Sequence, residues 1–260
     1  ELHEELEIEV LHATPWIVRE HRYEHAHVRL HFFRVDAWRG EIRDHVHAAL
    51  AWQRVGAAGM AAGVGVGVGV AGAAELADRA GAVGAGDAPR IDETSAVAPM
   101  LPANAPVLAA LALPAFYAIS QAGTLGIAVQ LAALDAALAR GLRLLQLREP
   151  QLAPAQFAEF ALAAVARCRA AGARVLVNGD VALARQCGAD GVHLSSAQLM
   201  QTATRPDFPL AAASCHTRAE LEQAARLGLD FAVLGSVKLT ASHPGQAALG
   251  WPAFAALAAD

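Results

Sequence analysis

From Pro114 onward, short apolar runs alternate with longer Ala-rich segments, and this alternation restricts the fold more than any other feature of the chain. Each run is five to eight residues long, which suits a buried strand. Strands that alternate with helices pair in parallel, because each helix returns the chain to the same end of the sheet. The predicted strands are 116–120, 142–149, 173–179, 191–195, 209–216 and 231–237.

The segments between these strands carry helix start and stop signals. Thr217 and Glu220 form a capping-box pattern, and Gly141 and Gly172 stand where two helices must end. Six strand–helix units in this order predict an α/β fold, namely an incomplete (β/α)8 TIM barrel over 114–260. The predicted helices are 124–141, 153–172, 180–188, 217–228 and 251–259.

The residues before Pro114 fall into segments of different composition. Residues 56–98 are rich in Gly and Ala, and no Gly-Lys-Ser/Thr sequence follows their Gly-Val repeat, so a phosphate loop is not indicated. The uncharged stretch 55–74 is long enough to span a membrane, but its glycines and its lack of aromatic anchors favour a linker. The predicted segments are 1–55, 56–98 as linker or insertion, 99–113 as a helix that belongs with the first segment, and 114–260.

Charge and cysteine usage narrow the function classes. A formal net charge of −5 argues against a general nucleic-acid binder, because such proteins usually present a basic surface. The three cysteines are scattered and form no CxxC pair, which indicates a reducing compartment without a disulfide framework. We therefore expect a cytoplasmic protein whose partners are small molecules rather than nucleic acids or membranes, and its oligomeric state stays open.

Polar side chains gather where the predicted strands end. The active site of a parallel barrel lies at the carboxyl ends of its strands. Arg148 suits an anionic group, Asn178 offers an amide, and His193 and His216 can move protons near neutral pH. For a single residue the commoner explanation is a side chain satisfied by neighbouring carbonyl groups. The whole set at one mouth favours a small-molecule site.

These same segments resemble a known family. "LQLRE", "VLVNGDVALA", "GADGVHLSS", "ASCHTRAELEQA" and "LDFAVLGSVKLTASHPG", in this order, resemble the thiamine phosphate synthase/TenI family over about 115–259. The resemblance implies a (β/α)8 barrel, a role in thiamine biosynthesis, and a thiazole or thiamine phosphate as ligand. Strands seven and eight of such a barrel are not represented before Asp260, so we expect the chain alone not to be a competent barrel enzyme.

Four departures from the synthase pattern bear on which branch of the family the chain follows. The resemblance places Pro150 and His243 where synthases have lysines, and Gly179 and Gln198 where they have carboxylates that bind Mg²⁺. These changes remove much of what would hold Mg²⁺ and a diphosphate. The chain therefore looks more like the TenI branch. In that branch the position of His216 is implicated in proton transfer during thiazole tautomerisation.

A second resemblance concerns the first segments. "ELHEELEI", "HVRLHFFRVDAWRGE", "LAWQ" and "PMLPANAPVLAAL" resemble a MutT-type Nudix hydrolase, an α/β/α fold, without the front of its motif. The resemblance implies Mg²⁺ as cofactor, Glu1, Glu4 and Glu5 as its ligands, and Glu4 and Glu5 as catalytic residues. It assigns Asn104 to the base of 8-oxo-dGTP. The implied activity is hydrolysis to 8-oxo-dGMP and pyrophosphate, which is nucleotide-pool sanitation in DNA repair.

Other features of the first segment leave alternatives open. Glu7 stands where the Nudix motif has a glycine, at a helix end that favours a left-handed residue, and Val46 stands where it has a metal-binding Glu. His25, His27 and His31 share a strand face by spacing. A zinc site is one interpretation of them, and solvated strand histidines are the favoured one because no ordered Cys, Asp or Glu accompanies them.

The main hypothesis is therefore a Nudix hydrolase fused to a TenI-like barrel, with His216 as proton shuttle and Arg148, Asn178 and His193 around the second ligand. One alternative is a non-catalytic module that binds a thiamine-related phosphate. Another takes thiazole tautomerase or thiamine phosphate synthase as the main activity. A third is one α/β enzyme for a phosphate ligand with an unrelated N-terminal extension.

Overall fold

The computed structural model describes residues 2–43, 105–239 and 248–258, and the chain divides into two compact units, Glu1–Leu113 and Pro114–Asp260. Within the described residues, no helix has the length and apolar character that crossing a membrane requires. The uncharged stretch 55–74 and the low-complexity segment lie outside these residues, as do the segment "LAWQ" of the Nudix resemblance and Val46.

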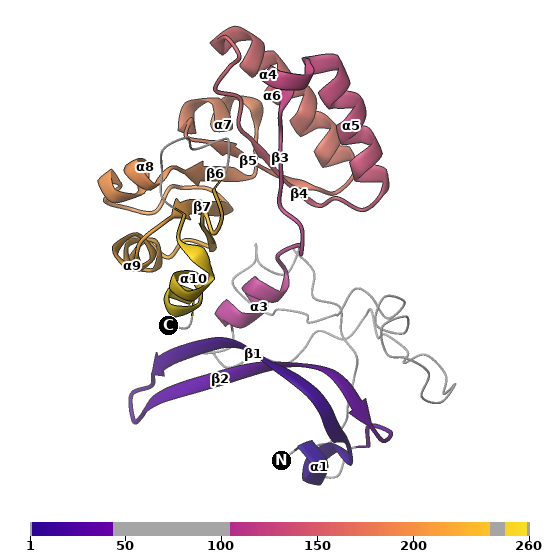
Figure 1. Cartoon of the computed structure of the whole chain (residues 1–260), viewed down its shortest axis with the longest axis vertical. Coiled ribbons are helices and arrows are strands. Elements are labelled where there is room, and N and C mark those ends of the chain that lie inside the picture. The colour runs from indigo at the N-terminus through magenta and orange to yellow at the C-terminus, as the bar shows by residue number, and fades with distance from the viewer. Residues whose placement is uncertain (1, 44–104, 240–247, 259–260) are drawn as a thin grey trace. The chain divides into compact units, whose positions relative to one another are not determined.

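Six parallel strands form one sheet in the C-terminal unit, and their spatial order is their order along the chain. The sheet curls with helices on its outer side (Figure 1), which makes it a half-barrel. The α/β prediction with six parallel strands is confirmed. The strands are β3 (Ala118–Ile119), β4 (Leu144–Leu147), β5 (Arg174–Asn178), β6 (Gly191–Leu194), β7 (Leu210–Cys215) and β8 (Phe231–Leu234).

Three predicted signals, at Gly141, Gly172 and Thr217, mark ends of helices in this unit, whereas the predicted helix 124–141 is divided at Gly126 into α4 and α5. Gly141 and Gly172 adopt left-handed backbone angles, with φ of 96° and 67°, and Thr217 forms the predicted capping box with Glu220. The helices are α4 (Ala122–Leu125), α5 (Ile127–Ala139), α6 (Pro154–Ala170), α7 (Val181–Cys187), α8 (Ser196–Gln201), α9 (Arg218–Arg226) and α10 (Gly250–Ala258).

Helix α8 is absent from the predicted elements. Its start is nevertheless written in the sequence, because Ser195 and Gln198 form a capping box with the Ser-x-x-Gln spacing. The helix has only six residues, too few for an apolar periodicity to show.

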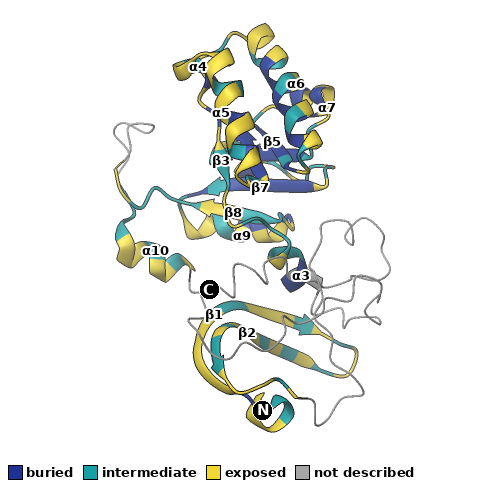
Figure 2. Ribbon diagram, turned by 90° about the vertical axis from the view of Figure 1, so that its right-hand side faces the viewer, coloured by how far each residue is buried: buried dark blue, intermediate teal, exposed yellow. Residues whose placement is uncertain are grey.

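The hydrophobic core lies between the sheet and the helices that cover its outer side (Figure 2). Val175 and Val177 of β5 pack there with Phe160 and Ala164 of α6, and all four are buried. Side chains alternate along a strand, so the residues between these valines face the inner side of the curl. The polar residues at strand ends described below belong to that inner side.

Two aspartates repeat one structural role at the amino ends of the strands. Asp190, just before β6, accepts a hydrogen bond from the backbone N–H of Val175 in β5 at 2.7 Å. Asp230, just before β8, accepts one from Ala211 in β7 at 2.7 Å and also pairs with Arg205 at 2.7 Å. Each carboxylate thus ties a strand to the one before it.

Replacing one of these aspartates tests the role. We expect Asp230→Ala to lower the free energy of unfolding by about 2 kcal/mol, because a backbone N–H and a guanidinium both lose their acceptor. Urea unfolding of the full chain measures this. Asp207→Ala removes an exposed carboxylate and should change the value by less than about 0.5 kcal/mol. Equal effects of the two variants would contradict the assignment.

The described part of the N-terminal unit is an antiparallel hairpin with two short helices. Strands β1 (Glu9–Arg22) and β2 (His27–Arg39) pair along their length, and the helices are α1 (Leu2–Leu6) and α3 (Ala105–Leu111). Burial alternates along β2, where every second residue from Val28 to Phe32 is partly buried.

Two features of the sequence of this unit can be compared with the backbone of the structure. Glu7 follows α1 with φ of 55°, and its N–H bonds to the carbonyl of His3 at 3.1 Å, so a left-handed residue does end this helix. His27 and His31 lie exposed on β2, whereas His25 lies in the hairpin turn.

Candidate functional site

Four buried or half-buried polar side chains form a connected network on the inner side of the sheet. Gln146 of β4 donates from Nε2 to the Tyr117 hydroxyl at 3.1 Å. That hydroxyl lies 3.2 Å from Nδ1 of His193 on β6, whose Nε2 lies 2.9 Å from the Ser214 hydroxyl on β7. The network extends across the inner side of the sheet from β4 to β7.

The histidine of this network is neutral. Burial lowers the pKa of His193 to about 4 from its usual 6.5, and the charge of Arg148 contributes in the same direction. Burial also raises the pKa of Tyr117. At pH 7 all four members are therefore uncharged donors and acceptors, which suits recognition of a polar but neutral ring.

Arg148 brings a positive charge to the carboxyl end of β4. Its backbone N–H donates to the Ser120 hydroxyl at 3.1 Å, which fixes the turn, and its side chain is half-buried. The carboxylate of neighbouring Glu149 is engaged elsewhere, because it accepts the backbone N–H groups of Ala122 and Gly123 at 2.7 Å each. Within the part of the chain that the structure describes, the Arg148 guanidinium makes no ion pair. Its charge makes it a candidate for binding an anionic ligand.

The ends of β5 and β6 carry neutral groups. Asn178 donates from Nδ2 to the carbonyl of His193 at 3.4 Å, and Gln198 donates from Nε2 to the carbonyl of Gly179 at 2.7 Å. The nearby carboxylate of Asp180 accepts the N–H of Leu183 at 2.8 Å and caps α7. Hard Mg²⁺ prefers carboxylate oxygens. The residues at this edge therefore do not fit a magnesium site.

His216 follows β7, and its ring has a defined tautomer. Nδ1 bonds to the carbonyl oxygen of Gly235, which can only accept, so Nδ1 carries the hydrogen in the neutral ring. Nε2 is then the nitrogen that takes up a proton. The backbone N–H of His216 donates to Glu220 at 2.5 Å, which holds this turn against the start of α9.

The four predicted residues of the barrel lie at the carboxyl ends of four consecutive strands, β4 to β7. The structure joins Asn178 to His193 and places Arg148 near enough to His193 to shift its pKa. No role was predicted for Tyr117, Gln146 or Ser214, although Gln146 and Ser214 lie near the ends of predicted strands. Polar residues inside otherwise apolar runs are the signal that finds them, because a polar side chain buried in a strand needs a partner.

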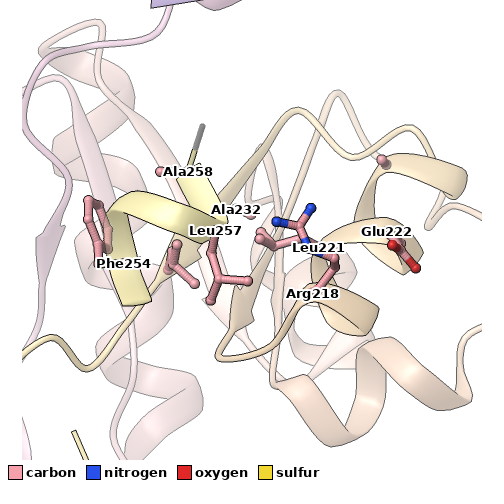
Figure 3. A pocket seen from close by; sticks show the side chains of 9 residues that line it. Arg218, Leu221, Glu222, Ala232, Phe254, Leu257 and Ala258 are labelled. Atoms are coloured by element: carbon pink, nitrogen blue, oxygen red, sulfur yellow. The ribbon is translucent and has the colours of Figure 1, made fainter. Parts of the chain in front are cut away.

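A cavity of about 560 Å³ lies elsewhere, between α9, β8 and α10 (Figure 3). Its walls are mainly alanine, leucine and phenylalanine side chains, and Arg218 at its side donates to the carbonyl of Ala256 at 3.1 Å. No member of the polar network lines it. The polar network at the strand ends and this cavity are therefore separate features.

The sequence model described as thiamine monophosphate synthase matches residues 116–260, which include every residue of this network. The chain belongs to this family. The resemblance drawn from the barrel segments is confirmed, and the Nudix resemblance of the first segments finds no support.

Three relatives illustrate the family match. The thiamine biosynthesis bifunctional protein ThiM/ThiE of Symbiobacterium thermophilum is 40% identical over 116 residues, 43% of this chain and 24% of that protein. A thiamine-phosphate synthase of Herpetosiphon aurantiacus is 36% identical over 140 residues, 51% of this chain and 68% of that protein. A solved thiamine phosphate pyrophosphorylase from Pyrococcus furiosus shares 21% identity, with 54% and 67% of the chains covered and a TM-score of 0.44.

The chain thus spans between about a quarter and about two thirds of the length of these relatives.

Nudix hydrolysis was predicted as the activity of the chain, with 8-oxo-dGTP as substrate and a role in DNA repair, and this prediction is wrong. The family match assigns the chain to thiamine monophosphate synthases, a transferase family. The physical reason for the error is that carboxylates at helical spacing are common on solvated helix faces. Glu4 is exposed and Glu5 partly exposed on the five-residue α1, whereas Glu1 and Asn104 lie outside the described residues. We assign these four residues no role.

The neutral state of His193 predicts a pH dependence of stability. Its pKa is lower in the folded than in the unfolded chain, so the unfolded chain binds more protons between about pH 4 and pH 6.5, and stability falls as pH falls through this window. Between pH 7.5 and pH 5 the histidine should account for about 2 kcal/mol of lost unfolding free energy.

His193→Gln should remove this part of the dependence, as measured by urea unfolding at both pH values. His25→Gln, in the exposed hairpin turn, serves as control and should keep the slope of the unmodified chain. An unchanged slope in the His193 variant would show that the ring is not held neutral by folding.

Proposed function

We propose that the C-terminal unit carries out the chemistry of a thiamine phosphate synthase. Thiamine phosphate consists of an aminopyrimidine joined to a thiazole phosphate, so a synthase must bind a neutral aminopyrimidine ring and phosphate groups side by side. The observation that supports the proposal most is the uncharged network of Tyr117, Gln146, His193 and Ser214 next to the charge of Arg148.

The network offers what an aminopyrimidine needs. The amino group of the aminopyrimidine donates hydrogen bonds and its ring nitrogens accept them. The amide and hydroxyl groups of the network can both donate and accept. Gln146 and Ser214 stand at opposite ends of the network, so a ring that lies across it meets a donor or an acceptor at either side. A charged histidine would donate only, and the depressed pKa of His193 avoids this.

Arg148 binds phosphate oxygens in this proposal. Its planar guanidinium can donate two parallel hydrogen bonds to a phosphate group. Magnesium belongs to the synthase resemblance, but the neutral residues at the ends of β5 and β6 do not fit it, and no step here runs through a metal ion.

A second candidate function is thiazole phosphate tautomerisation, which one observation favours. His216 has Nδ1 bonded to the carbonyl of Gly235, so Nε2 is the basic nitrogen, as a residue that shuttles a proton requires. The reaction needs a phosphate-bearing thiazole but no diphosphate. Asn178 and Arg148 would then lie around the thiazole phosphate rather than around a diphosphate.

Turnover by the full chain tests both candidates. The proposal predicts that thiamine phosphate forms from the aminopyrimidine diphosphate and thiazole phosphate, as followed by liquid chromatography, whereas the expectation drawn from the unrepresented strands seven and eight is that it does not. Arg148→Gln should lower kcat/KM by roughly 10- to 100-fold, because a charge-assisted hydrogen bond is lost. Arg140→Gln removes an exposed guanidinium at the end of α5 and should leave kcat/KM unchanged.

Two further outcomes separate the candidates. A chain that forms no thiamine phosphate but interconverts thiazole phosphate tautomers, with the rate lost in His216→Asn, would replace the first candidate by the second. Absence of both reactions, with intact folding, would remove both.

A further inference from the structure

The edge formed by Gly179 after β5 and Gln198 in α8 is where the synthase resemblance places magnesium carboxylates. Both residues lie in the described part of the chain, and neither carries a charge. The structure shows what the Gln198 side chain does instead of binding a cation.

The Gln198 amide ties two turns together. Nε2 donates to the carbonyl of Gly179 at 2.7 Å, and Oε1 accepts both the N–H and the hydroxyl of Ser195 at 3.0 Å each. An amide oxygen has two lone pairs, and both have a partner here. Oε1 could therefore ligate a cation only after one of these hydrogen bonds had broken.

The same amide occupies the space next to position 179. A Cβ added to Gly179 would lie 3.3 Å from Oε1 and 3.4 Å from Nε2 of Gln198. Any carboxylate side chain at 179 would thus extend toward the amide, and the backbone there has φ of 72°, which disfavours most side chains. The carboxylate nearest in sequence, Asp180, caps α7 through the N–H of Leu183 at 2.8 Å.

We infer that this chain has replaced the divalent cation by a side-chain amide, and that the pocket binds a phosphate monoester without metal. The Gln198 amide holds the turns after β5 and β6 together, as a bridging cation would. A monoester carries a charge of about −2 at neutral pH, less than a diphosphate ester, and Arg148 provides a charge for it. The choice of thiazole phosphate as this monoester rests on the proposed function, in which both candidate reactions use it.

Direct metal binding tests the first half on the full chain. Electron paramagnetic resonance of Mn²⁺ should show no specific site in the unmodified protein. The double variant Gly179→Asp/Gln198→Asp should gain one, because it restores two carboxylates. Gly179→Asn/Gln198→Asn makes nearly the same change in shape without charge and should bind none.

Calorimetry with thiazole phosphate tests the second half. The Kd should be the same within about twofold in magnesium and in EDTA, and Arg148→Gln should raise it by roughly tenfold or more. Arg140→Gln again serves as control.

Three results would overturn the inference: Mn²⁺ bound by the unmodified chain, a carboxylate double variant that folds and binds no Mn²⁺, or thiazole phosphate that binds only with magnesium. If the double variant does not fold, Gln198→Glu, which keeps the side-chain length, replaces it. Failure of thiazole phosphate to bind in either buffer would overturn the proposed function and the ligand half of the inference, while the Mn²⁺ result would still decide the metal half.

Discussion

Parallel pairing of β4 to β7 in chain order is the constraint on which the candidate site depends. It brings four carboxyl ends to one edge of the sheet, so residues as distant in sequence as Gln146 and Ser214 belong to one hydrogen-bonded network. The alternation of side chains then separates two environments across a single layer of backbone. Val175 and Val177 face the helices, whereas Gln146, His193 and Ser214 lie on the inner face of their strands. A shift of one residue in any strand would exchange the two faces.

Burial has opposite consequences for the polar groups on this inner face. It keeps His193 neutral, since charging a ring in a poorly hydrated site is costly. It leaves Arg148 charged beside it, half-buried and unmatched by a described carboxylate. A neutral region and a positive one therefore adjoin along the ends of β4 and β6. A ligand with an uncharged ring at one end and a phosphate at the other matches this division.

Periodicity and turn residues predicted the six strands, most of the helices and the four strand-end residues of the barrel, because these depend on local sequence. They did not predict the network around Tyr117, which depends on contacts between residues far apart in the chain. The amide of Gln198 was seen only as a missing carboxylate, since its hydrogen-bond partners depend on the geometry of two turns. The Nudix activity was wrongly predicted for a related reason, because the spacing of Glu4 and Glu5 suits metal ligands and also suits any solvated helix face.

Asp190 and Asp230, at the amino ends of the strands, make the two ends of the sheet unequal in rigidity. Asp190 and Asp230 join β5 to β6 and β7 to β8 with charge-assisted bonds at the amino ends, whereas Asn178, Gln198 and His193 join the carboxyl ends of β5, β6 and β7 through neutral groups. Charge-assisted hydrogen bonds are the stronger kind. Amide hydrogen exchange should accordingly be slowest at the base of the curl and faster toward its rim. The rim can adjust to a ligand while the base keeps the strands in register.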